Sequence, residues 1–271
     1  MRRRNVNTEK DSDNEHCSDN AESVEETLTN FDDQLSLMEQ ILLMGLKEKE
    51  GYTPAFNESI SFSIRAAILI ELGFCNRIEI VKSSRSVINN KIKIKSTQPT
   101  GNILLDEAVN IINSSPTIES VTTWIEYLNG DSWNPLKMMY QLRNVRERVA
   151  KSLSEKGICS VVQQNFFFFD TVTHPVVNRS PKQKLHKYIQ EGLLNKWQPD
   201  IKKMPVRLLA LIILANAADV LDDALNSLQD NDYSLVIKRL NKLITTNFQE
   251  LANKDADPVL MVLWSVVLAV Q

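Results

Sequence analysis

The sequence predicts a mainly α-helical protein, a single helical domain that carries one or two β-hairpins. Apolar residues recur at helical spacing over most of the chain after residue 33, and glycine, proline or asparagine stands at the ends of these stretches. Two short stretches are instead typical of strands: one alternates apolar and charged residues, and the other gathers aromatic residues. No internal repeat or linker interrupts residues 34–271, so we expect one domain there.

The N-terminal segment, residues 1–33, is expected to be a disordered tail. Residues 1–10 carry four cations and one acid, whereas residues 11–33 carry nine acids and no lysine or arginine. Few apolar residues accompany these charges, so the segment cannot bury enough surface to offset the entropy of ordering. Since the formal net charge is −3, about +3 remains on the rest of the chain. No apolar stretch follows the first arginines, unlike in a secretory signal peptide.

Cysteine usage and hydropathy indicate a soluble or at most peripheral protein of a reducing compartment. Cys17, Cys75 and Cys159 are widely spaced and follow no metal-ligand pattern. The longest apolar stretches, "LLALIILA" and "VLMVLWSVVLAV", are shorter than the roughly 20 residues that cross a bilayer. We expect both stretches to be buried helices.

In the first half of the domain, the pattern predicts four helices and one hairpin. The hairpin is expected within residues 77–96, because Ile78 and Ile80 alternate with charged residues, as do Ile92 and Ile94. The helices are expected within residues 35–51, 60–74, 99–115 and 117–130.

The second half begins with a predicted long helix over residues 134–157. Asn134 suits the N-cap, Pro135 the first helical position and Gly157 the C-terminal stop. Its expected apolar stripe is Met139, Leu142, Val145, Val149 and Leu153. A second hairpin is expected around "QQNFFFFDTVTHP", and further helices within residues 180–197, 205–228, 233–248 and 257–270.

The sequence predicts no enzyme, no metal site and no cofactor. His16, His174 and His186 have no partner at a metal-ligand spacing, and His186 lies among lysines on a predicted surface helix. Asp106 and Glu107 are adjacent on a predicted helix and therefore point in different directions. With 7 glycines in 271 residues, the chain offers no glycine-rich phosphate loop.

Three arginines are the candidate binding groups. Arg143 and Arg146 are three residues apart and share a face of the predicted long helix, where their planar forks of donors would suit a phosphate. The alternative is a solvated helix face with local ion pairs. Arg65 lies in an otherwise apolar helix, where a charge is costly unless it is paired or at the edge of a site. Its alternative is a buried ion pair with a carboxylate such as Glu71.

Four consecutive phenylalanines, Phe166, Phe167, Phe168 and Phe169, stand in the predicted second hairpin. In one strand, Phe166 and Phe168 would face one way, and Phe167 and Phe169 the other. One pair would enter the core, and the other would contact a subunit, another part of the protein or a membrane surface. The alternative is a strand that is buried on both faces.

Several longer motifs resemble the Golgi phosphoprotein 3 family, which includes the yeast vacuolar sorting homologue. They run from about Leu35 to near the C-terminus, and the densest are "LMEQILLMGLKEKEGYT", "PTGNILLDEA", "TWIEYLNGDSWNPLK", "YQLRNVRERVAKSLSEKG" and "NFFFFDTVTHP". The resemblance implies a mainly helical, non-enzymatic protein on the cytoplasmic side of the Golgi membrane and in the cytosol. It also implies binding to phosphatidylinositol 4-phosphate, to coatomer and to the cytosolic tails of Golgi glycosyltransferases, which the protein would retain in the organelle.

By the same resemblance, Arg65, Arg143 and Arg146 would bind the lipid headgroup. The hairpin with Phe166 to Phe169 would insert into the membrane or mediate self-association, so a homo-oligomer is expected. Arg2, Arg3 and Arg4 resemble an arginine cluster that is linked to coatomer.

One position departs from the family pattern. Family members read "SFWN" after "EGYT", whereas this chain reads "PAFN" and places Phe56 where the tryptophan would contact the lipid. Phenylalanine keeps an apolar ring but loses the indole donor. A divergent paralogue with weakened lipid binding is therefore one alternative. The other is a winged-helix-like nucleic-acid binder, suggested by "KIKIKS", although the charge of the domain is modest for that role; we expect no nucleic-acid partner.

Overall fold

The computed structural model describes residues 35–51, 58–83, 86–166 and 169–271. The chain divides into two units, Met1–Leu35 and Ser36–Gln271. The predicted tail, residues 1–33, lies outside the described residues, and the fold below is that of the second unit.

The second unit is mainly α-helical and carries two β-hairpins, which confirms the predicted fold class. The strands are β1 (Ile78–Val81), β2 (Lys91–Ile94), β3 (Val162–Phe166) and β4 (Phe169–Thr173), and the short 3₁₀ helices are η1 (Val87–Asn89), η2 (Pro135–Tyr140) and η3 (Ile201–Lys203). The α-helices are α2 (Leu37–Gly45), α3 (Glu58–Phe74), α4 (Ile103–Asn113), α5 (Val121–Asn129), α6 (Val145–Glu155), α7 (Ser180–Leu194), α8 (Val206–Ala217), α9 (Asp222–Leu225), α10 (Asp230–Ile244), α11 (Phe248–Lys254) and α12 (Pro258–Val270).

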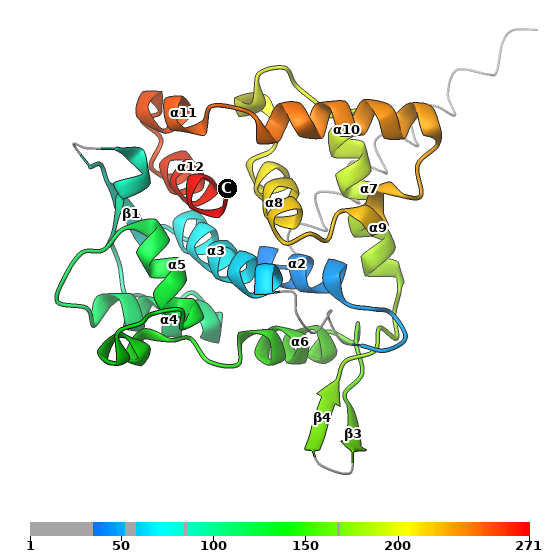
Figure 1. The fold of residues 1–271 in the computed structure, drawn as a ribbon, viewed down its shortest axis with the longest axis horizontal. Helices are drawn as coiled ribbons and strands as arrows, with labels where there is room; N and C mark the ends of the chain where they lie inside the picture. The colour runs from blue at the N-terminus through cyan, green and yellow to red at the C-terminus, as the bar shows by residue number, and fades with distance from the viewer. Residues whose placement is uncertain (1–34, 52–57, 84–85, 167–168) are drawn as a thin grey trace, which may run out of the picture. The chain divides into compact units, whose positions relative to one another are not determined.

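Helix α3 lies at the centre of the unit (Figure 1). It contacts α2, α4, α5, α6, α8 and α12. A helix that is apolar on all sides is stable only when it is surrounded, and Ile64, Ile68 and Leu72 are accordingly fully buried. Arg65 therefore lies on the most enclosed helix of the fold.

The first hairpin is confirmed. Strands β1 and β2 pair antiparallel, with Ile78 opposite Ile94 and Ile80 opposite Ile92. Ile78 and Ile92 are buried, as the alternation predicts. The hairpin packs against α12 through β1.

The second hairpin is also confirmed, but the phenylalanine run is not one strand. Phe166 ends β3 and Phe169 begins β4, and the two are paired in the antiparallel register. The expected alternation along a single strand is therefore wrong for this segment, because the chain reverses within the run. Phe167 and Phe168 lie outside the described residues. In Figure 1 the hairpin projects away from the helices.

The predicted long helix over residues 134–157 is wrong. The chain forms η2, then two residues without regular structure and a turn, and α6 begins only at Val145. Two features account for the break: the Leu142 amide donates to the Leu128 carbonyl on α5 at 3.0 Å, and Asn144 adopts a left-handed conformation with φ of 52°. Asn134 does cap η2, with its side chain accepting from the Leu136 amide. The stripe residues in and before α6 are buried, whereas Met139, in η2, is exposed.

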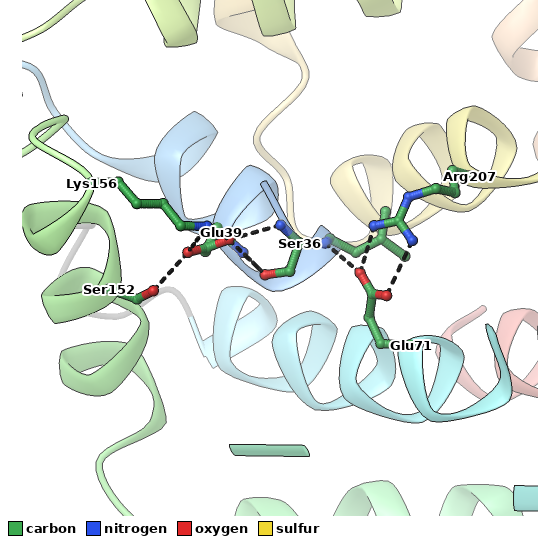
Figure 2. A network of polar contacts seen from close by, with 7 residues as sticks. Ser36, Glu39, Glu71, Ser152, Lys156 and Arg207 are labelled. Carbon is green, nitrogen blue, oxygen red and sulfur yellow. Dashed lines mark hydrogen bonds and ion pairs between the residues drawn. The ribbon is translucent and has the colours of Figure 1, made fainter. Parts of the chain in front are cut away.

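Two buried carboxylates tie the central helices together (Figure 2). Glu39 completes a capping box with Ser36 at the start of α2 and accepts hydrogen bonds from Ser152 and Lys156, both at 2.8 Å. This link joins α2 to the end of α6. The "SLME" stretch contains the spacing of a capping box, so the contact between Ser36 and Glu39 could be predicted from the sequence.

The other carboxylate, Glu71 on α3, pairs with Arg207 on α8 at 2.8 and 3.1 Å. It also accepts a hydrogen bond from the Leu37 amide at 2.8 Å. Figure 2 shows this contact beside the Glu39 network. The alternative prediction that Arg65 pairs with Glu71 is therefore wrong.

Helix α7 is less exposed than its lysines suggested. Lys182 is buried, and its ammonium donates to the Leu46 carbonyl at 2.7 Å. Burial lowers the pKa of Lys182, although Asp223 and Glu48 raise it again in part. His186, predicted to lie on the surface, is half-buried, because this face of α7 covers α9 and the end of α2.

Candidate anion-binding site

Arg65 is buried, and its charge is met by backbone carbonyls. Its Nε donates to the Leu128 carbonyl at 2.9 Å, its Nη1 to the Ser61 carbonyl at 2.9 Å, and its Nη2 to the Leu142 carbonyl at 3.2 Å. These acceptors lie on α3, at the end of α5 and just before α6. One guanidinium thus joins three elements that are distant in the sequence.

The environment disfavours the positive charge of Arg65. Burial lowers the pKa of Arg65 to about 10, and the nearby charge of Arg146 contributes in the same direction. Asp131 and Glu147 act in the opposite direction, but less strongly. A buried cation whose hydrogen-bond acceptors are neutral creates a positive potential that an anion would relieve.

Arg146, on the first turn of α6, is held against α3. Its Nε donates to the Ser61 hydroxyl at 2.6 Å, and the side chain is partly buried. Burial lowers the pKa of Arg146, while Glu147 and Glu58 oppose that shift. Ser61 therefore contacts both arginines, Arg65 through its carbonyl and Arg146 through its hydroxyl.

Arg143 lies in the turn that precedes α6, and its side chain is exposed. The sequence predicted that Arg143 and Arg146 share a helix. This is wrong, because α6 begins two residues after Arg143. It does directly follow Leu142, whose carbonyl accepts from Arg65. The structure thus brings Arg65 and Arg146 together around Ser61 and places the backbone of Arg143 one residue from the same cluster.

Several predicted site residues cannot be placed. Phe56 and Arg2, Arg3 and Arg4 lie outside the described residues, as do Phe167 and Phe168. In the sequence, Phe56 precedes Glu58, the first residue of α3, by two positions and Ser61 by five. The sequence therefore puts Phe56 close along the chain to the cluster.

Sequence reasoning missed Ser61 and the two carbonyls. Ser61 precedes Arg65 by four residues, so a polar residue one helical turn from a buried arginine is the signal that could have found it. The Leu128 and Leu142 carbonyls carry no such signal, because their positions depend on how α5 and the segment before α6 pack.

The chemical capacity of the cluster is that of guanidinium donors, which an anion could accept from. An arginine has five N–H donors, and within the described part of the chain Arg65 uses three of them on carbonyls. Planar guanidinium donors match the oxygens of a phosphate. Among the described residues, no group of three or more His, Cys, Asp or Glu side chains could hold a metal ion.

The chain of this helical fold matches a known family of proteins. A sequence model described as Golgi phosphoprotein 3 (GPP34) matches residues 37–259. The match covers most of the chain, so this protein belongs to the Golgi phosphoprotein 3 family, as its motifs predicted. Members of this family are in general non-catalytic.

One relative is the vacuolar protein sorting-associated protein 74 of Schizosaccharomyces pombe. The two chains are 36% identical over 225 residues, which is 78% of this chain and 66% of the relative. The aligned part thus spans just under two thirds of the relative's length.

The helices of the second unit do not cross a bilayer. Within the described residues, none is both long enough and apolar enough to do so.

Proposed function

We propose that this protein is a peripheral adaptor of the Golgi membrane whose arginine cluster binds the headgroup of phosphatidylinositol 4-phosphate. The observation that carries the proposal is the Arg65–Ser61–Arg146 arrangement, in which burial lowers the pKa of both arginines. Membership of the Golgi phosphoprotein 3 family supports the Golgi location and a role in protein sorting.

In this mechanism the headgroup phosphate accepts from Arg146 and from the exposed Arg143. Arg65 acts mainly without touching the phosphate. It fixes the end of α5 and the turn before α6, and its charge adds to the positive electrostatic potential at the site. Basic groups near an anionic membrane surface contribute about 1 kcal/mol each. The cluster would therefore give selective but modest affinity, and a second membrane contact is needed for stable binding.

The test compares the parent chain with the double variant Arg143→Ala, Arg146→Ala in flotation with vesicles that contain phosphatidylinositol 4-phosphate. Loss of two cations is expected to weaken binding by at least about tenfold. The matched control is Lys238→Ala with Lys242→Ala, which removes two exposed cations from α10. In Figure 1 this helix lies on the opposite side of the unit from α6. Equal binding by the arginine variant and the parent would refute the assignment.

The cellular role that we propose is retention of Golgi glycosyltransferases. The protein would bind their cytosolic tails and coatomer together, with Arg2, Arg3 and Arg4 contacting coatomer and the phenylalanine hairpin supporting a homo-oligomer. The family match supports this adaptor role. Co-precipitation of coatomer with the parent chain, and its loss on Arg2→Ala, Arg3→Ala, Arg4→Ala, would test the first contact.

The related alternative is a paralogue whose lipid affinity is weakened by phenylalanine at position 56. The substitution Phe56→Trp restores the larger ring and its N–H donor. If lipid affinity rises while the arginine variant still abolishes binding, the site is the proposed one in a weakened form.

A further inference from the structure

The segment between α5 and α6 exposes four large apolar side chains, of which Met138, at 48%, is the least exposed. Trp133 is fully exposed, Leu136 is 77% exposed and Met139 is 72% exposed. We call these three side chains the apolar edge. Single exposed apolar residues are common, but three within seven residues form a patch that usually marks an interaction surface.

The apolar edge follows from the local backbone. Leu136 and Met139 lie in η2, and side chains three residues apart in a 3₁₀ helix stand above one another. Trp133 precedes them by another three residues and lies just before the Asn134 cap. The spacing therefore places Leu136 and Met139 on one side of η2, and Trp133 adjoins them along the chain.

The opposite side of the segment is firmly held. Tyr140 is buried, stacks on Tyr127 with ring centroids 5.8 Å apart and meets Trp124 edge-on. The Lys137 ammonium lies 5.1 and 5.2 Å from the Tyr127 and Tyr140 ring centroids. The apolar edge thus faces outward because other residues of the same segment fill the inward positions.

Arg65 connects the apolar edge to the candidate headgroup site. Its guanidinium binds the carbonyl of Leu128, before the segment, and that of Leu142, after it. The two ends of the segment are therefore fixed by the residue that also lies beside Arg146. Residues 131–146 contain three cations and one acid, and of these cations Lys137 lies 4.0 Å from Glu119, which leaves Arg143 and Arg146 as the positive charges next to the segment.

We propose that Trp133, Leu136 and Met139 insert into the interfacial layer of an anionic membrane when the neighbouring arginines hold the lipid headgroup. This inference deepens the proposed function and rests on it. The adjacent positive charge favours an anionic bilayer over an acid-lined protein surface. Tryptophan is moreover enriched at the level of the headgroups, and insertion of apolar side chains supplies the second contact that stable membrane binding requires.

In Figure 1 the green segment between α5 and α6, helix α6 and the β3–β4 hairpin all lie along the lower margin of the unit. The apolar edge and the hairpin would then contact the membrane on either side of the arginine cluster. Two apolar contacts around one headgroup would fix the orientation of the protein as well as its affinity.

The first experiment places Trp133 relative to the bilayer. The chain has four tryptophans; Trp124 and Trp264 are buried and Trp197 is partly buried. Fluorescence of the parent chain is expected to be quenched by brominated acyl chains in vesicles that contain phosphatidylinositol 4-phosphate. Trp133→Phe should remove most of that quenching, whereas the matched control Trp197→Phe should retain it. Equal quenching of the Trp133→Phe variant and the parent would overturn the proposal.

The second experiment measures affinity with the triple variant Trp133→Ser, Leu136→Ser, Met139→Ser. Binding to the same vesicles is expected to fall by at least about tenfold, since burial of each side chain contributes to partitioning. Binding to the water-soluble, deacylated headgroup and the thermal midpoint should be unchanged, because these side chains are exposed. The control Leu235→Ser removes an exposed leucine from α10 and should bind vesicles as the parent does.

The outcomes separate this proposal from the headgroup assignment. If the arginine variant binds vesicles normally while Trp133 is quenched, the headgroup assignment fails and the apolar edge stands. If the triple variant binds vesicles like the parent, the apolar edge fails and the headgroup site stands. Loss of soluble-headgroup binding in the triple variant would show a structural role and overturn membrane insertion. Membrane insertion is also overturned if the triple variant loses only concentration-dependent self-association. That result would identify a second copy of the chain as the partner of the apolar edge.

Discussion

Arg65 shows how one residue combines structural and electrostatic roles. Replacing it with methionine keeps much of the apolar stem but leaves the Ser61, Leu128 and Leu142 carbonyls without their donor. The free energy of unfolding is expected to fall by about 3 kcal/mol, which urea denaturation would measure. Arg143→Ala, at an exposed position, should change it by less than about 0.5 kcal/mol. An unchanged urea midpoint for Arg65→Met would contradict the buried network.

His174, which is buried, and His186, which is half-buried, give the stability a pH dependence. Burial lowers the pKa of His174 and of His186. Lys182 lowers the pKa of His186 further, whereas Asp223 and Glu48 partly raise it again. The unfolded chain, with a histidine pKa near 6.5, therefore takes up protons first as the pH falls. The stabilising effect is complete above that value and is lost as the pH falls through the folded-state values.

We accordingly expect the thermal midpoint to decrease between about pH 7 and pH 5.5, before most carboxylates titrate. The double variant His174→Gln, His186→Gln should show a smaller decrease over the same range. Calorimetry of both proteins provides the measurement, and parallel pH profiles would show that other groups cause the change.

At the scale of the element, the start of α6 depends on the conformation of Asn144. Its φ of 52° lies in the left-handed region, which asparagine and glycine tolerate and β-branched residues do not. Asn144→Val is expected to cost about 1–2 kcal/mol, whereas Asn144→Gly should be close to neutral. Urea unfolding of the two variants compares them directly, and equal midpoints would mean that the break has another cause.

This break also shows what the sequence could and could not predict. Asn134, Pro135 and Gly157 were assigned correct roles as local signals, because caps and stops depend on the residues that carry them. Their combination into one helix was wrong, because the interruption is stabilised by a hydrogen bond from Leu142 to Leu128, on another element. Fold class and hairpins follow from periodicity, whereas helix boundaries respond to tertiary contacts.

The same limit applies to the candidate site. Arg65 could be singled out because a charge in an apolar helix needs an explanation. Its acceptors could not be predicted, since three carbonyls from separate elements leave no pattern in the sequence. The apolar edge likewise requires a structure, because Met139 fits a helical stripe equally well until the helix is seen to break.

At the scale of the whole molecule, the second unit contains a complete core. Trp124, Trp264 and Phe248 are among its largest fully buried side chains. A chain that begins at Leu35 is expected to keep the thermal midpoint of the parent to within about 2 °C. A chain that begins at Gln40 also loses Ser36 and Glu39, and should melt several degrees lower. A large decrease in the thermal midpoint of the chain that begins at Leu35 would contradict the division into two units.

The junction at Ser36 determines where a mechanical load would enter the fold. Ser36 shares Glu39 with Ser152 and Lys156, and both of these residues lie at the end of the helix that begins beside Arg146. A partner that pulls on the preceding residues would therefore strain the far end of α6 first. In the adaptor that we propose, a pull on these residues and a headgroup held by Arg146 would therefore load opposite ends of α6.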